Sequence, residues 1–423
     1  MIVTSACTIG ASGAAVEPLH IGVDLPLTGP EARAALPALN GIHFFVQQHP
    51  RLDGFDVSIE SLDDARMGPP RPDVGAANIS SFIKDPALVA VIGPFDSSVA
   101  RKEIPVANAA GLALISPSTS NPCLTKDTFL PAGLDPTGQA IACKDAGLPS
   151  ASELRPTHVN NFFRLAPTDD LQGPAAADFA VKNLHLIRAA VISDDEAYGE
   201  ALADGFTARF QKLGGSVVGR LDFNPATDSD ATTFLKRVKA DGAQAVYFGG
   251  ATSGKGCVIR AEMKGIFDGG EASPYLGSDG IAEDPVCIRD AAGNAAGVYA
   301  TVPAVDAASL PAAAKTIAAF KSAFGRTSDY GPYTMVAYDA TAVLYAAIDR
   351  AIRAAGGQLP VRGNVVSQLS VTSRFAGTTG TIGFDSLGDT TGRVISVVEP
   401  SGNDPASPWK LSGILDYSVA LPY

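Results

Sequence analysis

The sequence predicts an α/β protein made of two doubly wound, parallel-sheet units, and three observations lead to this prediction. The chain has 423 residues, which is too long for one small domain. Short runs rich in Val, Ile and Leu alternate with helical patterns from residue 20 onward, which is typical of buried parallel strands. The middle third repeats this rhythm, so two successive α/β units are expected.

In the first unit, apolar runs and helical patterns alternate regularly along the chain. The expected strands are at residues 20–24, 55–62, 89–93 and 112–116. The expected helices are at residues 33–48, 74–84 and 98–109.

The second unit repeats the alternation of strands and helices, and the C-terminal part adds two helices and a hairpin. Strands are expected at residues 188–193, 216–223, 244–249 and 273–278. Leu202, Phe206, Phe210 and Leu213 recur every three or four residues and predict one apolar face of a helix. Two further helices are expected at 310–324 and 334–354. The segment 379–402 predicts a hairpin, because "LGD" and "TTG" supply turns.

Composition and charge exclude several classes of protein. Hydrophobic residues make up 46% of the chain, enough to bury real cores. Lys and Arg number 32 against 44 Asp and Glu, a net charge of -12, and no basic stripe is present. Nucleic acid is therefore excluded as a partner, since neutralising phosphates needs clustered cations. No run of ~18 apolar residues predicts a membrane span.

Four of the five cysteines predict two disulfides, Cys123–Cys143 and Cys257–Cys287. The first pair closes a Pro/Gly-rich loop, and the second lies around the ends of two neighbouring elements. Disulfides would place the protein outside the cytoplasm, whereas the alternative is four buried thiols. Small residues surround the fifth, Cys7, as at the start of a lipoprotein after its signal. Cys7 is either a lipidation site or a free thiol on a mobile tail.

The stretch "GGATSGKG" at residues 249–256 follows a predicted strand and precedes a predicted helix, as a phosphate-binding loop does. Gly256 stands where that motif requires the Ser or Thr that binds Mg²⁺. The motif's own mechanism is therefore broken, and we expect Lys255 to be solvated or to cap nearby carboxylates. We expect Gly249 and Gly250 to let the backbone approach a ligand closely.

Polar segments follow the predicted strands, where open α/β sheets bind their ligands. The first unit offers mainly hydroxyls and backbone amides, in "TGP" 28–30, "DSS" 96–98 and "SPSTSN" 116–121. The second unit offers carboxylates and a tyrosine, in "DDEAY" 194–198 and "SDG" 278–280. Hydroxyls and helix-start amides suit an anion, and an acid suits a cation, so a ligand with its own carboxylate and ammonium would complement both faces. Taken singly, each serine is equally typical of a helix cap or turn.

The segments "VIGPFDSSVARKEIPVANAAGLALISPSTSNPCLT" and "FFRLAPTDDLQGPAAADFAV" resemble the branched-chain amino acid binding proteins of bacterial ABC importers. The similarity continues in the same order through "AAVISDDEAYGEALADGF", "YLGSDG" and "DYGPYTMVAYDATAVL", and it runs from residue 19 to residue 398. It implies the type I periplasmic binding fold, whose two lobes are joined by a three-stranded hinge. The chain then divides into a tail at 1–18, a first lobe at 19–166 plus 303–377, and a second lobe at 167–302 plus 378–423.

The resemblance implies a carboxylate anchor on the first lobe. Ser97 corresponds to the serine whose hydroxyl holds the ligand's carboxylate. Ser118 and Ser120 correspond to residues whose carbonyl and hydroxyl contact the ammonium and the carboxylate, and Thr119 between them is included in the site.

The resemblance implies that the second lobe and its rim complete the site. Tyr198 corresponds to an aromatic residue that covers the ligand, Asp279 to an acid that pairs with the ammonium, and Tyr333 to an aromatic residue at the rim. Relatives often carry the longer glutamate at the position of Asp279. Ala34 and Ala251 stand where relatives carry pocket aromatics, which suggests a ligand bulkier than leucine unless neighbouring residues fill the space.

The implied function is an extracytoplasmic solute-binding protein of an ABC importer. It would hand an amino acid or related small carboxylate to a permease, work as a monomer, need no cofactor or metal, and meet a membrane only if Cys7 is lipidated. The alternative is a sensory ligand-binding module of the same fold. No catalytic residue is expected: GxSxG and HExxH are absent from the sequence, and the pairs Asp63–Asp64 and Asp194–Asp195 are more typical of solvated caps than of an acid/base pair.

Overall fold

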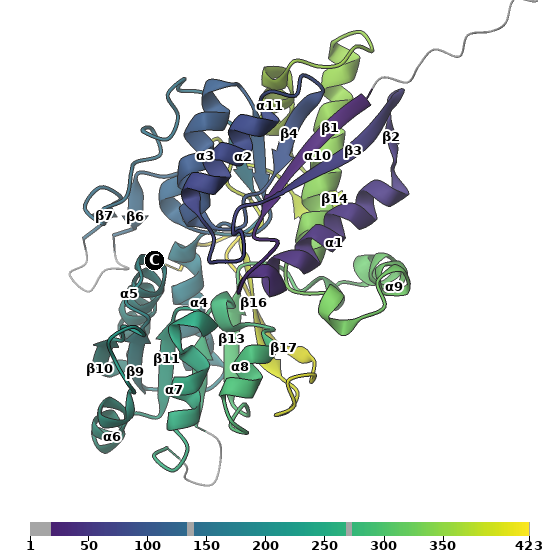
Figure 1. Cartoon of the computed structure of the whole chain (residues 1–423). Helices are drawn as coiled ribbons and strands as arrows, with labels where there is room; N and C mark the ends of the chain where they lie inside the picture. The colour runs from purple at the N-terminus through teal and green to yellow at the C-terminus, as the bar shows by residue number, and fades with distance from the viewer. Residues whose placement is uncertain (1–17, 133–138, 268–272, 423) are drawn as a thin grey trace, which may run out of the picture.

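Two α/β lobes are stacked one above the other in the computed structural model, which describes residues 18–132, 139–267 and 273–422 (Figure 1). Cys7 lies outside the described residues. Within those residues, no helix combines the length and the apolar character that a membrane crossing requires. Each lobe has its own sheet, as the sequence predicts, and the eight predicted strands are present within two residues of their expected bounds.

The first lobe is built on a six-stranded sheet that is parallel except at its β2 edge. In spatial order its strands are β2 (Arg51–Leu52), β3 (Phe55–Asp63), β1 (Pro18–Leu25), β4 (Leu88–Ile92), β5 (Ala113–Ser116) and β8 (Phe162–Arg164). The strands β1, β4 and β5 are almost entirely buried, which explains their continuous apolar runs. Their carboxyl ends point toward the second lobe (Figure 1).

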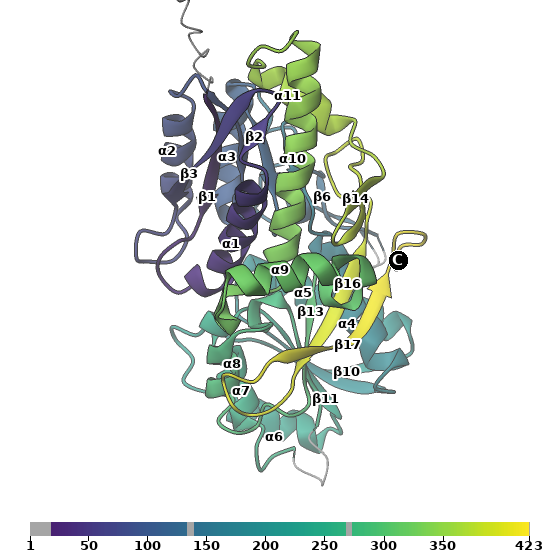
Figure 2. The ribbon, with the colours of Figure 1, turned by 90° about the vertical axis from the view of Figure 1, so that its right-hand side faces the viewer.

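Helices cover both faces of this sheet. The helices of the lobe are α1 (Ala32–Gln48), α2 (Pro72–Phe82), α3 (Ser97–Ala109), α10 (Thr334–Ala354) and α11 (Arg362–Ser370). Val91 and Leu114 pack under α2 and α3, whereas Ile92 and Ile115 pack under α1 and α10, so alternate strand residues supply the two cores. The helix α9 (Ala314–Ala323) packs against α1 near the level where the lobes meet (Figure 2).

The second lobe is built on a seven-stranded sheet that is parallel in its first five strands. In spatial order these are β10 (Ser216–Asp222), β9 (Arg188–Ser193), β11 (Ala245–Gly249), β12 (Tyr275–Gly277), β13 (Val298–Val302), β16 (Val394–Pro400) and β17 (Trp409–Asp416). The last two strands pair antiparallel.

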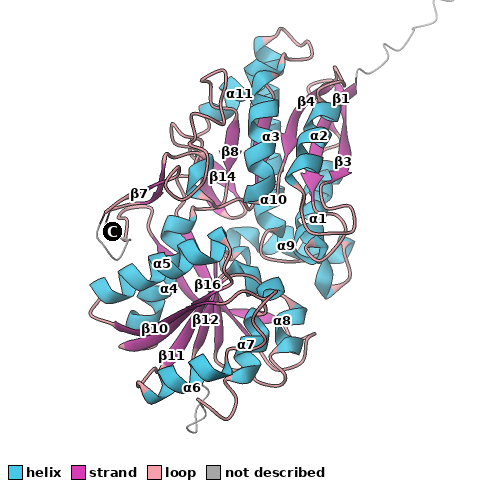
Figure 3. Ribbon diagram, turned by 60° about the vertical axis from the view of Figure 1, so that its left-hand side comes forward, coloured by secondary structure: helices cyan, strands magenta, loops and turns pink. Residues whose placement is uncertain are grey.

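The helices of this lobe also form two layers. They are α4 (Asp169–Lys182), α5 (Ala197–Lys212), α6 (Thr232–Ala240), α7 (Gly256–Glu262) and α8 (Pro285–Asp290). Figure 3 shows α4 and α5 on one side of the sheet and α6 and α7 on the other. Leu202, Phe206 and Phe210 of the predicted stripe are fully buried against the sheet, where Phe206 stacks on Tyr247 at 4.1 Å. The fourth residue of the stripe, Leu213, follows α5 and is half-buried.

Three described segments connect the lobes: residues 165–168 between β8 and α4, residues 303–313 between β13 and α9, and residues 383–393 before β16. A buried ion pair ties the first to the last, with Arg164 Nε 2.7 Å from Asp389 Oδ1. Arg164 also donates to the Asn121 carbonyl at 2.7 Å. Because both charged groups are paired inside the protein, this bond orders the point at which the chain changes lobe.

The predicted hairpin at 379–402 is wrong. Its first strand, β15 (Gly380–Ile382), pairs back onto β14 (Phe375–Gly377), and its second, β16, joins the sheet of the second lobe. Only one bridge, between Phe384 and Thr390, spans the "LGD" turn. The predicted turns are present, but β16 pairs with strands of the buried sheet in the second lobe instead of with β15.

Both predicted disulfides are present, Cys123–Cys143 and Cys257–Cys287. The first closes a loop that carries the small strands β6 (Thr128–Leu130) and β7 (Ile141–Ala142). This loop packs on Ala201 of α5, so an extension of the first lobe contacts the second (Figure 1).

Candidate ligand-binding site

The carboxylate of Asp279 is the centre of a hydrogen-bond cluster at the contact between the lobes. Asp279 follows β12, at the carboxyl edge of the second sheet. Its Oδ1 accepts from the Tyr198 hydroxyl at 2.5 Å and from Gln172 Nε2 at 2.8 Å, and its Oδ2 accepts from the Tyr333 hydroxyl at 2.7 Å. Burial, and then the neighbouring carboxylate, raise the pKa of both tyrosines, so both hydroxyls keep the protons that they donate.

Two side-chain contacts cross between the lobes near Asp279. Tyr333 precedes α10 of the first lobe, so its bond to Asp279 crosses between lobes. A second crossing contact joins Arg33 of α1 to Asp284, with Nε and Oδ1 3.4 Å apart. The Tyr333 ring is only 5% exposed and meets the ring of Phe95 edge-on at 5.5 Å.

The predicted serines lie together on the first lobe. Ser97 begins α3, and its Oγ accepts from the Asn121 amide at 3.2 Å, which leaves its own proton available for a ligand. Ser118 and Ser120 follow β5. The Ser118 hydroxyl donates to the Phe95 carbonyl at 2.8 Å, and the Ser120 carbonyl accepts from the Asp169 amide at 2.9 Å.

Two further predicted positions flank these groups. Thr119 is 1% exposed, and its hydroxyl has no hydrogen-bond partner among the described residues. Ala251 lies against Gly280, directly after Asp279, and a side chain on that glycine would come within 2.8 Å of the Ala251 Cα. The structure therefore places Ala251 beside the Asp279 cluster and Thr119 inside the serine loop.

Four polar residues of this region were not among the predicted site residues. Gln172 on α4 bonds to Asp279, and Asp169 precedes it on the same helix. Glu31 stands before α1, Asp96 precedes Ser97, and each of these two carboxyl groups influences the pKa of the other. The sequence indicates that their segments, "TGPE", "DSS" and "TDDLQG", are strand-end loops. No local sequence pattern indicates that Glu31 lies near Asp96.

The acids of this region have raised pKa values. Burial, followed by the charge of Asp279, raises the pKa of Asp169 to about 7 against the opposing bond from Ser120. Burial is also the main reason why the pKa values of Glu31 and Asp96 are raised, with the charge of Asp279 adding to it. Burial therefore disfavours the charged form of each of these acids, and a cation beside them would favour it.

The "GGATSGKG" loop surrounds an acid rather than a phosphate. Asp194 Oδ2 accepts from the Ala251 amide at 3.1 Å, and side chains on Gly250 or Gly254 would clash with the Asp194 carboxyl. A side chain on Gly249 would clash with the Gly199 carbonyl. The glycines thus admit protein groups, not a ligand as we expected, and a carboxylate already fills the cradle that a phosphate would need.

Lys255 is half-exposed and its charge reaches the Glu262 carboxyl, so the expectation of a solvated or capping side chain is confirmed in part. Its Nζ donates to the Asp228 carbonyl at 3.2 Å and lies 5.7 Å from the centre of the Phe223 ring.

The acid pairs Asp63–Asp64 and Asp194–Asp195 were predicted to be solvated caps, and only some of these acids are solvated. Asp63 does cap a loop, accepting from the amides of Leu27 and Ala65. Asp64, in contrast, is 0% exposed and Asp194 5% exposed, so the prediction is wrong for both. Both are held under the strand ends by packing that the local sequence does not reveal. Within the part of the chain that the structure describes, no group of three His, Cys, Asp or Glu residues is placed to hold a metal ion.

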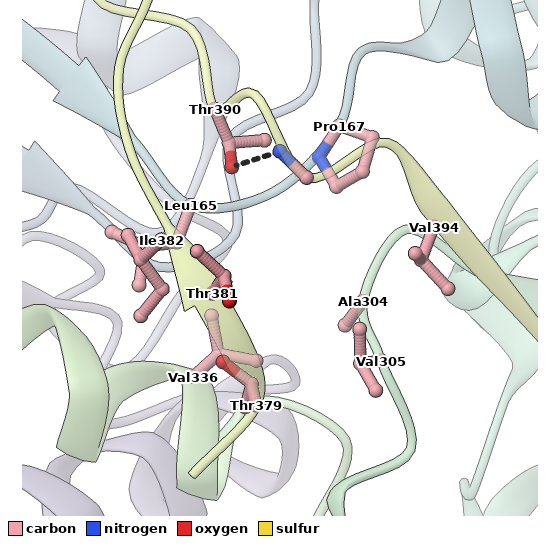
Figure 4. A pocket seen from close by; sticks show the side chains of 11 residues that line it. Leu165, Pro167, Ala304, Val305, Val336, Thr379, Thr381, Ile382, Thr390 and Val394 are labelled. Atoms are coloured by element: carbon pink, nitrogen blue, oxygen red, sulfur yellow. Dashed lines mark hydrogen bonds between the residues drawn. The ribbon is translucent and has the colours of Figure 1, made fainter. Parts of the chain in front are cut away.

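A small hollow, partly open to solvent, lies among the segments that connect the lobes rather than at the Asp279 cluster. Figure 4 shows Leu165, Ala304 and Thr390, one from each connecting segment, among its lining residues. The hollow therefore lies between the connecting segments and is separate from the predicted site.

Known proteins resemble this chain over nearly its whole length. The profile of the periplasmic binding protein family matches residues 18–399. The Leu/Ile/Val-binding protein homolog 3 of Brucella melitensis is 30% identical over 352 residues, covering 82% of this chain and 83% of the relative.

Solved structures share the fold. The branched-chain amino acid transporter substrate binding protein LivJ of Streptococcus pneumoniae, in complex with isoleucine, has a TM-score of 0.72 and 18% identity, covering 95% of this chain and 99% of that one. A solute binding protein of R. palustris, in complex with 4-hydroxybenzoate, has a TM-score of 0.73 and 16% identity, covering 94% of this chain and 97% of that one. At these identities, the likeness shows the two-lobed fold alone.

Proposed function

The chain belongs to the periplasmic binding protein family, and we propose that it captures an amino acid or related small carboxylate between its lobes and delivers it to an ABC permease. Members of this family are extracytoplasmic and bind solutes rather than catalyse reactions. A membrane-bound permease is the partner that this function requires.

One observation supports the proposal above all: the Asp279 carboxylate stands at the lobe contact together with the serine loop of the first lobe. Ser97, Ser118 and Ser120 would hold a ligand carboxylate, while Asp279 would receive an ammonium group. A carboxylate has about four acceptor positions, and Tyr198, Tyr333 and Gln172 occupy three of those on Asp279, so one remains.

The names of the relatives support the ligand class. The Brucella relative is named for leucine, isoleucine and valine, and the Streptococcus structure contains isoleucine. The R. palustris structure contains a benzoate, which has a carboxylate and lacks an ammonium group. Both kinds of ligand fit an anchor made of hydroxyls.

The transport step would be a change of population between open and closed forms. Residues 19–166 with 303–377 would move as one lobe, and residues 167–302 with 378–423 as the other. A ligand that contacts both lobes favours the closed form by its difference in affinity for the two forms.

A thermal-shift screen on refolded, ligand-stripped protein tests the proposal with amino acids, aromatic acids, short peptides and Mg-ATP. A ligand at about 100 times its Kd adds about 2.7 kcal/mol to the free energy of unfolding, enough for a visible rise in Tm. We expect a shift with one class of amino acid or carboxylate. A shift with Mg-ATP alone would overturn the proposal.

A further inference from the structure

We propose that the interlobe site selects an amino acid whose side chain ends in an ammonium or guanidinium group, and that Glu31 and Asp96 receive this group. The inference rests on the proposed function and names its substrate class. It starts from the carboxyl groups around the site, which outnumber the single α-ammonium of a neutral amino acid.

Four carboxyl groups surround the place where the ligand would lie. Asp279 and Asp169 lie on the side of the second lobe, and Glu31 and Asp96 lie on the first. The charge of Asp279 reaches each of the other three. Burial disfavours the charged form of Asp169, Glu31 and Asp96, and a nearby cation would favour it. One α-ammonium compensates about one carboxylate, so a neutral amino acid would leave the other acids without a cation.

The two nearby arginines are paired with other acids, although the charge of Arg33 also reaches Glu31. Arg164 interacts with Asp169 but is paired with Asp389 in the hinge. Arg33 has a side chain that is 48% exposed, and it is paired with Asp284 of the second lobe.

The geometry around Asp96 and Asp169 indicates that a donor group belongs there. Asp169 is 3% exposed, and its Oδ1 has no hydrogen-bond partner among the described residues. The Oδ2 of Asp96 is likewise buried without a partner in the described part of the chain. Buried acceptors without partners are costly, and a charged donor from a ligand would satisfy them.

The second cation would lie on the first lobe, away from Asp279. Asp96 directly precedes Ser97, the proposed carboxylate anchor, and Glu31 lies on the loop that leads into α1. Ala34 lies exposed on α1, three residues after Glu31, and Ala251 lies beside Gly280, which follows Asp279. A metal ion is a poorer fit, because the described acids offer no three-residue ligand set.

Isothermal titration of the ligand-stripped full chain tests the inference with lysine, arginine, leucine, 4-hydroxybenzoate and cadaverine. We expect lysine or arginine to bind at least about 10-fold more tightly than leucine, the equivalent of one charged hydrogen bond. Tighter binding of leucine or 4-hydroxybenzoate would overturn the inference and leave the proposed function standing. Cadaverine binding more tightly than lysine would also overturn it, since the ligand would then need no carboxylate. No binding by any of these compounds, together with no shift in the thermal screen, would count against the proposed function itself.

The variants E31Q and D96N test the assigned residues. Each should weaken lysine or arginine by about 10- to 100-fold and change leucine binding by less than about 3-fold. E60Q makes the same charge change at an exposed position on β3 and should leave all affinities unchanged. Equal losses for leucine and lysine in both variants would overturn the assignment. If one variant does not fold, the other variant and the wild-type selectivity still decide.

Discussion

Replacing Asp279 by asparagine tests the centre of the proposed site most directly. The substitution keeps the shape of the side chain and removes its charge. Asparagine Oδ1 can still accept from Tyr198 and Gln172, but its NH₂ group replaces the oxygen that accepts from Tyr333 at 2.7 Å. The variant therefore loses the partner of the ligand ammonium and weakens one bond between the lobes.

The magnitude follows from the environment of the carboxylate. Asp279 is half-buried and meets two tyrosines that lie largely out of water. Removing one partner of a desolvated charge pair costs about 2–5 kcal/mol. The Kd of an α-amino acid ligand should therefore rise by about 30- to 4,000-fold.

The assay is isothermal titration of wild type and Asp279→Asn with the amino acid identified in the screen and with its 2-oxo acid analogue. The analogue lacks the ammonium group, so its affinity should fall far less. Asp241→Asn, at an exposed position after α6, is the matched control and should bind both ligands as wild type does. If Asp279→Asn leaves the Kd of the amino acid unchanged, no ammonium group lies at Asp279 and the reasoning is refuted.

Three further predictions concern stability. Arg164→Ala should lower the free energy of unfolding by about 3–5 kcal/mol, because it leaves Asp389 buried and unpaired. Urea unfolding measures this loss, and a value below about 1 kcal/mol would contradict a buried ion pair. Burial, with the charges of neighbouring acids, raises the pKa of Asp64 to about 8, so the folded chain keeps a proton that the unfolded chain releases, and stability should fall as pH rises from about 4 to about 8. Asp64→Asn should reduce this fall by a few kcal/mol, on the order of 1.4 kcal/mol per unit of pKa shift, and identical Tm-versus-pH slopes would contradict it. Replacing Cys257 and Cys287 by serine should lower the free energy of unfolding by about 3–4 kcal/mol, because the unfolded chain is no longer closed across their separation of 30 residues. The same urea assay measures this loss, and an unchanged midpoint would count against the disulfide.

Elements with strong local patterns could be predicted from the sequence alone. The strand β9 and the helix α10 have the expected bounds, 188–193 and 334–354. The reason is that a buried parallel strand is a continuous apolar run, and a long helix shows its 3.6-residue period. The two disulfides were predicted for a similar reason, since each pair closes a short stretch of chain.

The C-terminal strands were decided by tertiary structure. β16 was expected to pair within a local hairpin, and β17, which is only half-buried, was not among the predicted strands. The strand β16 leaves the turn that precedes it and pairs with β13, almost a hundred residues earlier in the chain. Pairing over such distances depends on which sheet edge is free, and no local pattern records that.

The same division holds for the site. The resemblance placed Ser97 and Asp279 in loops at strand ends, and the rule that ligands bind at the carboxyl edges of parallel sheets indicated the same loops. Only the folded chain brings Glu31 to Asp96 and Tyr333 to Asp279, because these contacts join segments that the sheet order sets side by side. Local sequence determines which residues can begin a helix or end a strand, whereas the burial and charge of each carboxyl depend on neighbours that arrive from distant parts of the chain.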